Sequence, residues 1–185
     1  MSTTEAIVAA AVAVVLIVAL VWWITKLRRR TELHERFGDE YEIVLEEQGS
    51  RRKAERELVA RQERYEHLDI RPLGPQLRRR YAEQWRTTQG RFVDEPAAAL
   101  EEADRLVEAV MVERGYPVGD AERQMADLSV EHSDVLGHYR AAHDIALASA
   151  AGKTTTEDLR RGMVHYWALF DALLDDHAHA PTIRR

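Results

Sequence analysis

The sequence predicts an all-α fold, with one N-terminal transmembrane helix followed by a compact multi-helix bundle. Three observations predict it. Residues 6–24 form a run of 19 residues without a charged side chain. Apolar residues in the rest of the 185-residue chain recur at spacings of three and four, which is the period of an α-helix. No segment alternates apolar and polar residues between turn signals, as a half-buried strand would.

The predicted transmembrane helix covers residues 6–25 and follows a short tail, residues 1–5. At about 1.5 Å per residue, its uncharged part is long enough for the ~30 Å hydrocarbon core of a bilayer. Aromatic and basic side chains gather at its C-terminal end, where we expect them at the membrane interface: Trp22, Trp23, Lys26, Arg28, Arg29 and Arg30. A cleaved signal peptide would carry its basic residues before the apolar run. The alternative to a membrane span is a buried core helix.

The charges that flank this helix predict its orientation. The residues before it contain Glu5 and no Lys or Arg, whereas the basic cluster follows it. Positive flanks stay on the cytoplasmic side, so we expect a single-pass cell-membrane protein with its N-terminus outside and its C-terminal domain in the cytoplasm. The formal net charge of -6 is divided into -1 from Glu5, +4 over residues 26–91 and -9 over residues 92–185. The acidic distal half argues against a nucleic-acid binder.

Residues 26–70 are predicted to form a charged, helical juxtamembrane spacer. Gly38 and Gly49 are its expected breaks. Asp39 can cap a short helix, and Ser50 can cap a second one that runs to about residue 67. The second helix carries only a narrow apolar stripe, formed by Ala54, Leu58, Tyr65 and Leu68. Such a helix packs weakly, waits for a partner or acts as a stalk, and the sequence leaves these options open.

A helical domain is predicted over residues 71–176, before a polar tail at residues 177–185. Pro75 suits the first turn of its first helix, because its backbone has no N–H to satisfy there. The expected inward face of that helix is Leu77, Tyr81, Trp85 and Phe92. Asp94 is the expected cap of the next helix, and Gly115 is its expected end in the left-handed conformation. The inward face of this second helix is Leu100, Ala103, Val107, Val110 and Met111.

Three further helices complete the predicted domain. Asp120 is expected to cap a short helix whose apolar side is Ala121, Met125 and Leu128. Ser133 is expected to start a longer helix whose inward residues are Val135, Leu136, Tyr139, Ala142 and Ala146. Residues 154–158 form a capping box that fits either of two registers and opens the last helix. The expected inward face of the last helix is Leu159, Met163, Tyr166, Trp167, Phe170 and Leu174.

Six short motifs stand out in the sequence: Arg91–Pro96, Glu102–Val107, Arg114–Pro117, Asp127–Val130, His138–His143 and Met163–Tyr166. They resemble the motifs of an uncharacterised family of small bacterial membrane-anchored proteins. The resemblance covers most of the chain after about residue 64. It implies a single-pass, membrane-anchored helical protein, and it implies no activity, cofactor or functional residue.

Four histidines are the candidate ligands for a metal ion or a substrate: His132, His138, His143 and His165. A two-histidine site on one helix needs a spacing of three or four, whereas His138 and His143 are five residues apart and point to different sides. The sequence contains no Gly-x-Ser-x-Gly nucleophile motif and no phosphate-binding glycine loop. Without cysteine it can form no thiolate site. We therefore predict no catalytic residue, no cofactor and no metal ligand.

The predicted function is a membrane-tethered, non-enzymatic interaction module that enters the bilayer through residues 6–25 and binds another protein. The small helical domain, the lack of visible chemistry and the charged spacer favour this interpretation. The alternative is a small ligand- or metal-binding helical domain, or an enzyme, that uses the region of His132, His138, His143 and His165. A third option is a structural subunit that self-associates as a homo-oligomer.

Overall fold

The computed structural model describes residues 16–18, 20–21, 23–24, 31–117 and 119–175. These residues form helices and no strand, so the predicted all-α fold is confirmed for this part of the chain. A helical segment at residues 31–37 comes before the first complete helix. The helices that follow are α2 (Asp39–Gln48), α3 (Arg51–Glu66), α4 (Pro75–Arg91), α5 (Pro96–Arg114), α6 (Ala121–Leu128), α7 (Ser133–Ala150) and α8 (Thr156–Leu174).

The predicted membrane span falls largely outside the described residues. Within the described part of the chain, no helix has both the length and the apolar character needed to cross a bilayer. Residues 6–25 are described only at seven positions, and the basic cluster at residues 26–30 is not described. Of the predicted interface residues, Trp23 alone is described, with an exposed fraction of 61%. The span and its orientation stay predictions.

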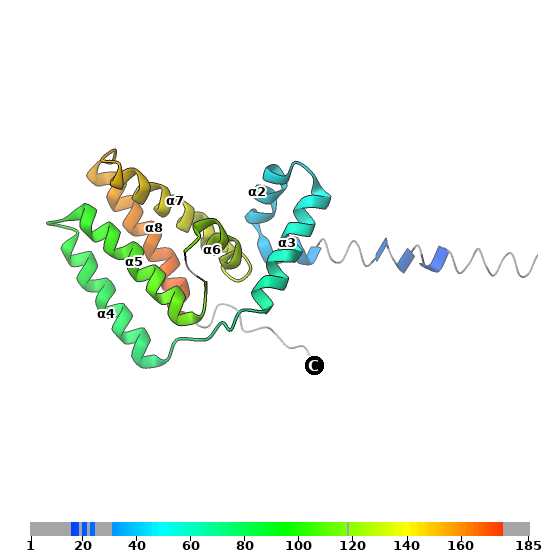
Figure 1. Cartoon of the computed structure of the whole chain (residues 1–185), viewed down its shortest axis with the longest axis horizontal. Coiled ribbons are helices and arrows are strands. Elements are labelled where there is room, and N and C mark those ends of the chain that lie inside the picture. The colour runs from blue at the N-terminus through cyan, green and yellow to red at the C-terminus, as the bar shows by residue number, and fades with distance from the viewer. Residues whose placement is uncertain (1–15, 19, 22, 25–30, 118, 176–185) are drawn as a thin grey trace, which may run out of the picture.

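Helices α4, α5, α7 and α8 form the main bundle, in which α8 packs against both α5 and α7, and α4 packs against α5 (Figure 1). The centre of the bundle is aromatic. Its largest buried side chains are Trp85, Tyr139, Tyr166 and Phe170. Trp85 of α4 stacks on Phe170 of α8 with 4.6 Å between the ring centroids. Stacked rings contribute about 0.5–1.5 kcal/mol beyond their burial, so this pair helps to hold α4 on the bundle.

The inward face of α8 is wider than the predicted one. Four of the predicted core residues are buried: Leu159, Met163, Tyr166 and Phe170. Trp167, in contrast, is 40% exposed and Leu174 is half-buried, while Leu169 and Leu173 are buried in their place. The prediction was wrong at Trp167, because α8 packs against both α5 and α7. A helix that packs against two neighbours buries a broader face than a helix that packs against one.

Helix ends follow the local signals closely. Gly115 ends α5 with φ +98°, and an added Cβ there would lie 2.4 Å from the backbone oxygen of Asp69. The capping box at α8 adopts the register of Thr155 and Asp158. Hydrogen bonds from the hydroxyl and backbone N–H of Thr155 lower the pKa of Asp158 to about 2.

Two predicted caps are wrong by one position. Gly38, and not Asp39, is the N-cap of α2, and Asp39 is the first residue of that helix. Glu95, and not Asp94, is the N-cap of α5, and its side chain makes no capping hydrogen bond. Pro96 occupies the first helical turn, and its fixed φ sets the start of the helix directly after residue 95. The backbone constraint of proline therefore outweighs the side-chain preference of an aspartate two residues before it.

Helices α2 and α3 form a hairpin that lies at one end of the bundle, next to α6 (Figure 1). The hairpin has its own small core, formed by Leu33, Phe37, Tyr41, Val44, Ala54, Leu58 and Val130. Val130 comes from the connection between α6 and α7, so this core is shared with the bundle. Further contacts join α3 to α6 and α2 to α7. Among the options left open by the sequence, residues 31–66 therefore pack on the helical domain.

Candidate functional site

An open groove lies where the α2–α3 hairpin meets the bundle. Its walls come from residues 32–43, from α3, and from residues 130–140 at the start of α7. The groove has a volume of about 1560 Å³. Pockets for small molecules commonly measure about 300–1000 Å³ and enclose their ligand. The dimensions therefore suit a segment of a macromolecule better than a small ligand.

The lining of this groove is acidic. Residues 32–43 contribute Glu32, Glu35, Asp39 and Glu40. The other two walls contribute Glu63, Glu66, Glu131 and Asp134. These eight carboxylates are accompanied by two guanidinium groups among the described lining residues, those of Arg36 and Arg140. Two apolar side chains interrupt the charged lining, since Ile43 and Val59 are 37% and 40% exposed.

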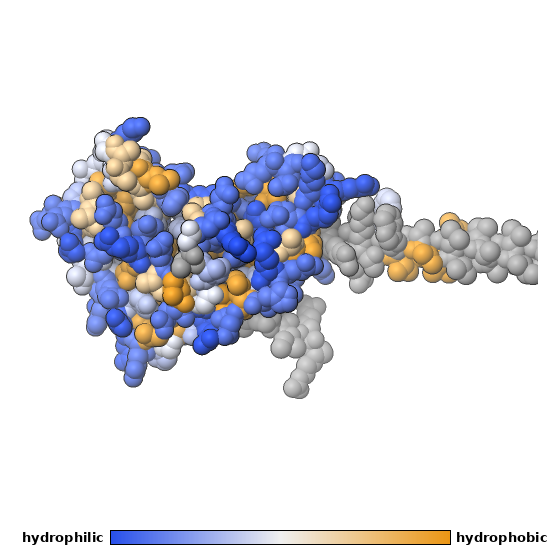
Figure 2. Space-filling view, in the orientation of Figure 1, coloured by the Kyte–Doolittle hydropathy of each residue, from blue (hydrophilic) through white to orange (hydrophobic). Residues whose placement is uncertain are grey.

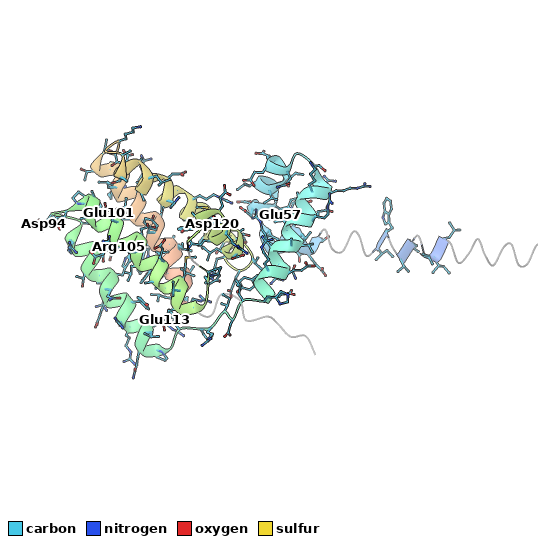
Figure 3. The ribbon with its side chains drawn as sticks, in the orientation of Figure 1. Glu57, Asp94, Glu101, Arg105, Glu113 and Asp120 are labelled. Atoms are coloured by element: carbon cyan, nitrogen blue, oxygen red, sulfur yellow. The ribbon has the colours of Figure 1, made fainter. Side chains whose placement is uncertain are left out.

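Acidic side chains also occur elsewhere on a surface that is mostly hydrophilic, with small and separate hydrophobic patches (Figure 2). Glu101 and Glu113 lie on α5, and Asp94 lies just before it (Figure 3). None of these three residues lines the groove. What distinguishes the groove is the combination of concave shape, concentrated negative charge and apolar contact points.

A buried ion-pair network holds the groove walls together. Glu40 of α2 accepts hydrogen bonds from Arg140 of α7 at 2.6 and 2.8 Å and from Arg61 of α3 at 2.8 Å. Only 2% of the Glu40 side chain is exposed. A buried carboxylate loses its hydration, and paired guanidinium groups offset that loss. The hydrogen bonds to Glu40 raise the pKa of Arg140. This network joins the hairpin to the bundle across 100 residues of sequence.

A second polar cluster surrounds Glu131. Its carboxylate accepts hydrogen bonds from the hydroxyls of Tyr65 and Tyr116, the latter at 3.0 Å. Arg114 lies 3.8 Å away and His132 lies 3.9 Å away. Burial alone would raise the pKa of Glu131, but these four side chains together lower it. Glu131 is therefore a carboxylate that the fold keeps ionised at the edge of the groove.

The two tyrosines of this cluster act as hydrogen-bond donors. Burial is the main cause that raises the pKa of both Tyr65 and Tyr116. Each hydroxyl therefore stays protonated around neutral pH and donates to Glu131. Arg114 in turn donates to the backbone oxygen of Leu173 at 2.9 Å. The cluster thus joins α3, the end of α5, the α6–α7 connection and the end of α8, which indicates a structural role for these groups.

Further contacts fix residues 32–43, which form one wall of the groove, on the bundle. Ser133 donates through its hydroxyl to the backbone oxygen of Arg36 at 3.1 Å, and Arg36 donates to the backbone oxygen of Val130 at 3.4 Å. Asp127 of α6 is buried, and burial raises its pKa, while Arg64, Arg123 and Arg61 lower it. Positive side chains of α3 thus attract α6 at the same junction.

The candidate histidines lie in three different environments. His138 of α7 and His165 of α8 meet across the helix pair, with 2.8 Å between their Nδ1 atoms. His132 is buried near Glu131 and His143 lies beside the ring of Tyr139, with 6.2 Å between the centroids. The structure therefore brings together two of the four residues. Among the described residues, no group of three or more His, Cys, Asp or Glu side chains is arranged to hold a metal ion.

Sequence reasoning missed the charged residues that organise the groove. Glu40, Glu131 and Arg140 were not singled out, because helical periodicity assigns charged residues to the solvent face by default. One signal was available for Glu131, which directly follows the apolar Val130 in a short connection. No comparable signal exists for Glu40, since its partners lie 21 and 100 residues away in the sequence.

No family model, curated protein or solved structure matches this chain in the comparisons with known proteins. The resemblance to an uncharacterised family of membrane-anchored proteins stays a prediction. Any functional proposal therefore depends on the groove and on the histidine pair themselves.

Proposed function

We propose that the chain is a membrane-tethered, non-enzymatic interaction module whose groove binds a basic, partly apolar segment of another protein. The observation that carries this proposal is the lining of the groove, which has seven carboxylates and one guanidinium group besides the paired Glu40 and Arg140, and the exposed side chains of Ile43 and Val59. A Lys- or Arg-rich segment gains complementary charge there, which favours fast association and correct orientation. The same charges would repel the phosphates of a nucleic acid.

The proposed tether draws on the N-terminal sequence. The uncharged run at residues 6–24 is followed at once by Lys26, Arg28, Arg29 and Arg30. The apolar residues described within this run are exposed by 41–63%: Leu16, Ile17, Val18, Leu20, Val21, Trp23 and Ile24. Exposed apolar side chains of this kind favour burial in lipid or against a partner. The groove begins at Glu32, so a juxtamembrane segment of a partner would lie within its reach.

Site-specific photocrosslinking tests the groove in native membranes. A photoreactive amino acid at Ile43 or Val59 should capture the bound segment, whereas the same probe at Val93, which is 84% exposed and lies outside the groove, should not. Charge reversal by Glu63→Lys together with Glu66→Lys should abolish the adduct. An adduct of equal yield from Val93, or one that survives this charge reversal, would contradict the proposal.

The matched control for the double charge reversal is Glu101→Lys together with Glu113→Lys, because both residues are exposed on α5 and neither lines the groove. This variant changes the net charge by the same amount but should leave the adduct intact. Loss of the adduct in the control would show that overall charge, and not the groove, governs association.

Thiol labelling tests the tether and its orientation independently, since the chain contains no cysteine. Ser2→Cys and Thr182→Cys variants are each probed in intact cells with a membrane-impermeant reagent. Labelling at position 2 alone agrees with the proposed orientation. Labelling at position 182 alone would reverse the orientation, and equal labelling at both positions would contradict a single membrane span.

A further inference from the structure

His138 and His165 place two imidazole rings against each other on neighbouring helices. Their Nδ1 atoms are 2.8 Å apart, the ring centroids are 5.1 Å apart and the ring planes are inclined by 36°. Two ring nitrogens cannot face each other at this distance with both lone pairs free, because the lone pairs repel. Either one ring donates its Nδ1–H to the other, or a metal ion takes the place of that proton and binds both nitrogens.

We propose that His138 and His165 form a two-histidine binding site for Cu²⁺, with water molecules in the remaining coordination positions. Imidazole nitrogen is a preferred ligand of copper, which binds nitrogen ligands more tightly than the other divalent metals of its row. Copper(II) favours tetragonal geometry, in which neighbouring ligands subtend about 90° at the metal. With metal–nitrogen bonds of about 2.0–2.1 Å, two such nitrogens lie about 2.9 Å apart.

The observed separation of 2.8 Å is therefore close to the distance that copper requires. Tetrahedral zinc would need roughly 3.3 Å between the two nitrogens, and thus a larger movement of the rings. Because α7 and α8 pack against each other, the two backbone positions that carry the rings are fixed before any metal binds. Little backbone freedom is lost on binding, which favours affinity.

The surroundings of the pair suit a ligand that exchanges with solvent. His138 is exposed and His165 is half-buried, so water can complete the coordination. The neutral imidazole is the form that binds metals. Arg161 is paired with Asp158, and this pairing reduces its repulsion of an incoming cation.

Copper titration of the full-length chain in mild detergent tests the site. All variants carry His177→Ala and His179→Ala, because these two tail residues lie outside the described part of the chain and can chelate copper themselves. We expect one bound Cu²⁺ per chain, with a paramagnetic resonance spectrum that shows coupling to two nitrogens. When a metal ligand loses its hydrogen-bond partner, metal affinity falls about tenfold. His138→Gln and His165→Gln each remove a ligand itself, so each should lower the copper affinity by more than that.

The control is His143→Gln, which removes a half-buried histidine from the same helix and should leave copper binding unchanged. Equal copper affinity in the background protein and in His138→Gln would overturn the proposal, as would an equal loss in His143→Gln. If circular dichroism shows that His165→Gln does not fold, the exposed His138→Gln variant decides the question by itself. Tighter binding of Zn²⁺ than of Cu²⁺ would contradict the proposed tetragonal geometry.

Discussion

Replacement of Glu40 by glutamine should detach the hairpin from the bundle without unfolding the bundle. The variant keeps the volume of the side chain but leaves Arg61 and Arg140 without their shared carboxylate. Removal of one partner from a buried ion pair costs about 3–5 kcal/mol. The side chain of Arg140 is 29% exposed and Arg61 keeps Glu57 as a partner at 3.1 Å, so both retain some compensation. We therefore expect a loss of about 2–3 kcal/mol.

Two measurements check this expectation on the full-length chain in mild detergent. Thermal unfolding followed by circular dichroism should show a Tm about 4–12 °C lower than that of the wild type. Amide hydrogen exchange should accelerate in α2 and α3 while amides of α5 and α8 stay protected, because local opening involves the less stable unit first.

The matched control is Glu57→Gln, which also removes a carboxylate from Arg61 but at a side chain that is 34% exposed. Such partly exposed pairs contribute about 0–1 kcal/mol, so the control should change stability little. A Glu40→Gln variant as stable as this control would refute the reasoning. Uniform acceleration of exchange in all helices would also refute it, because the ion pair would then support global stability and not the docking of the hairpin.

Three further changes have defined expected outcomes. Gly115→Ala should lower the free energy of unfolding, measured by chemical denaturation, by at least about 2 kcal/mol, because the added Cβ would meet a positive φ and the backbone oxygen of Asp69. Gly152→Ala, at φ +67° in open space, should lower it by about 1 kcal/mol. Gly162→Val should destabilise the protein by about 1–3 kcal/mol, since an added Cβ lies 2.8 Å from a side chain of α5, while Gly90→Ala in open space should be neutral or stabilising. Glu131→Gln should make the free energy of unfolding depend less on pH under acidic conditions. The folded-state pKa of Glu131 lies below its ordinary value of 4.5, so its contribution is complete above that pH and is lost as the pH falls through the lower folded-state value. Denaturation midpoints measured between about pH 5 and pH 3 should therefore fall more steeply in the wild type than in the variant, and parallel curves would exclude this role.

Helix positions were predictable because their signals are local. The cap at Asp120 is fixed by groups within three residues, since its side chain accepts a hydrogen bond from the backbone N–H of Arg123. The left-handed glycine at the end of α5 and the capping box at α8 are equally local, and the structure has both where the sequence predicts them. The apolar face of α5 was also predictable, because its buried residues recur at helical spacing.

The groove and the histidine pair were not predictable, because both depend on how distant helices meet. Spacing rules for metal ligands were applied to a single helix, whereas His138 and His165 are 27 residues apart and meet across two helices. Charged residues such as Glu40 look solvent-exposed in any periodicity pattern. Their burial becomes favourable only when folding supplies partners, here Arg61 and Arg140.

The position of the groove has a thermodynamic consequence for any segment that binds there. Because its walls belong to both the hairpin and the bundle, a segment that touches both walls binds the docked arrangement in preference to the detached one. Binding and docking are then linked, and each stabilises the other by the same free energy. Glu40→Gln should therefore weaken the binding of such a segment even where the segment does not contact Glu40. Once the detached form predominates, each tenfold reduction in the docked population lowers the apparent affinity tenfold. A variant that lost affinity without faster exchange in α2 and α3 would instead show that Glu40 contacts the segment directly.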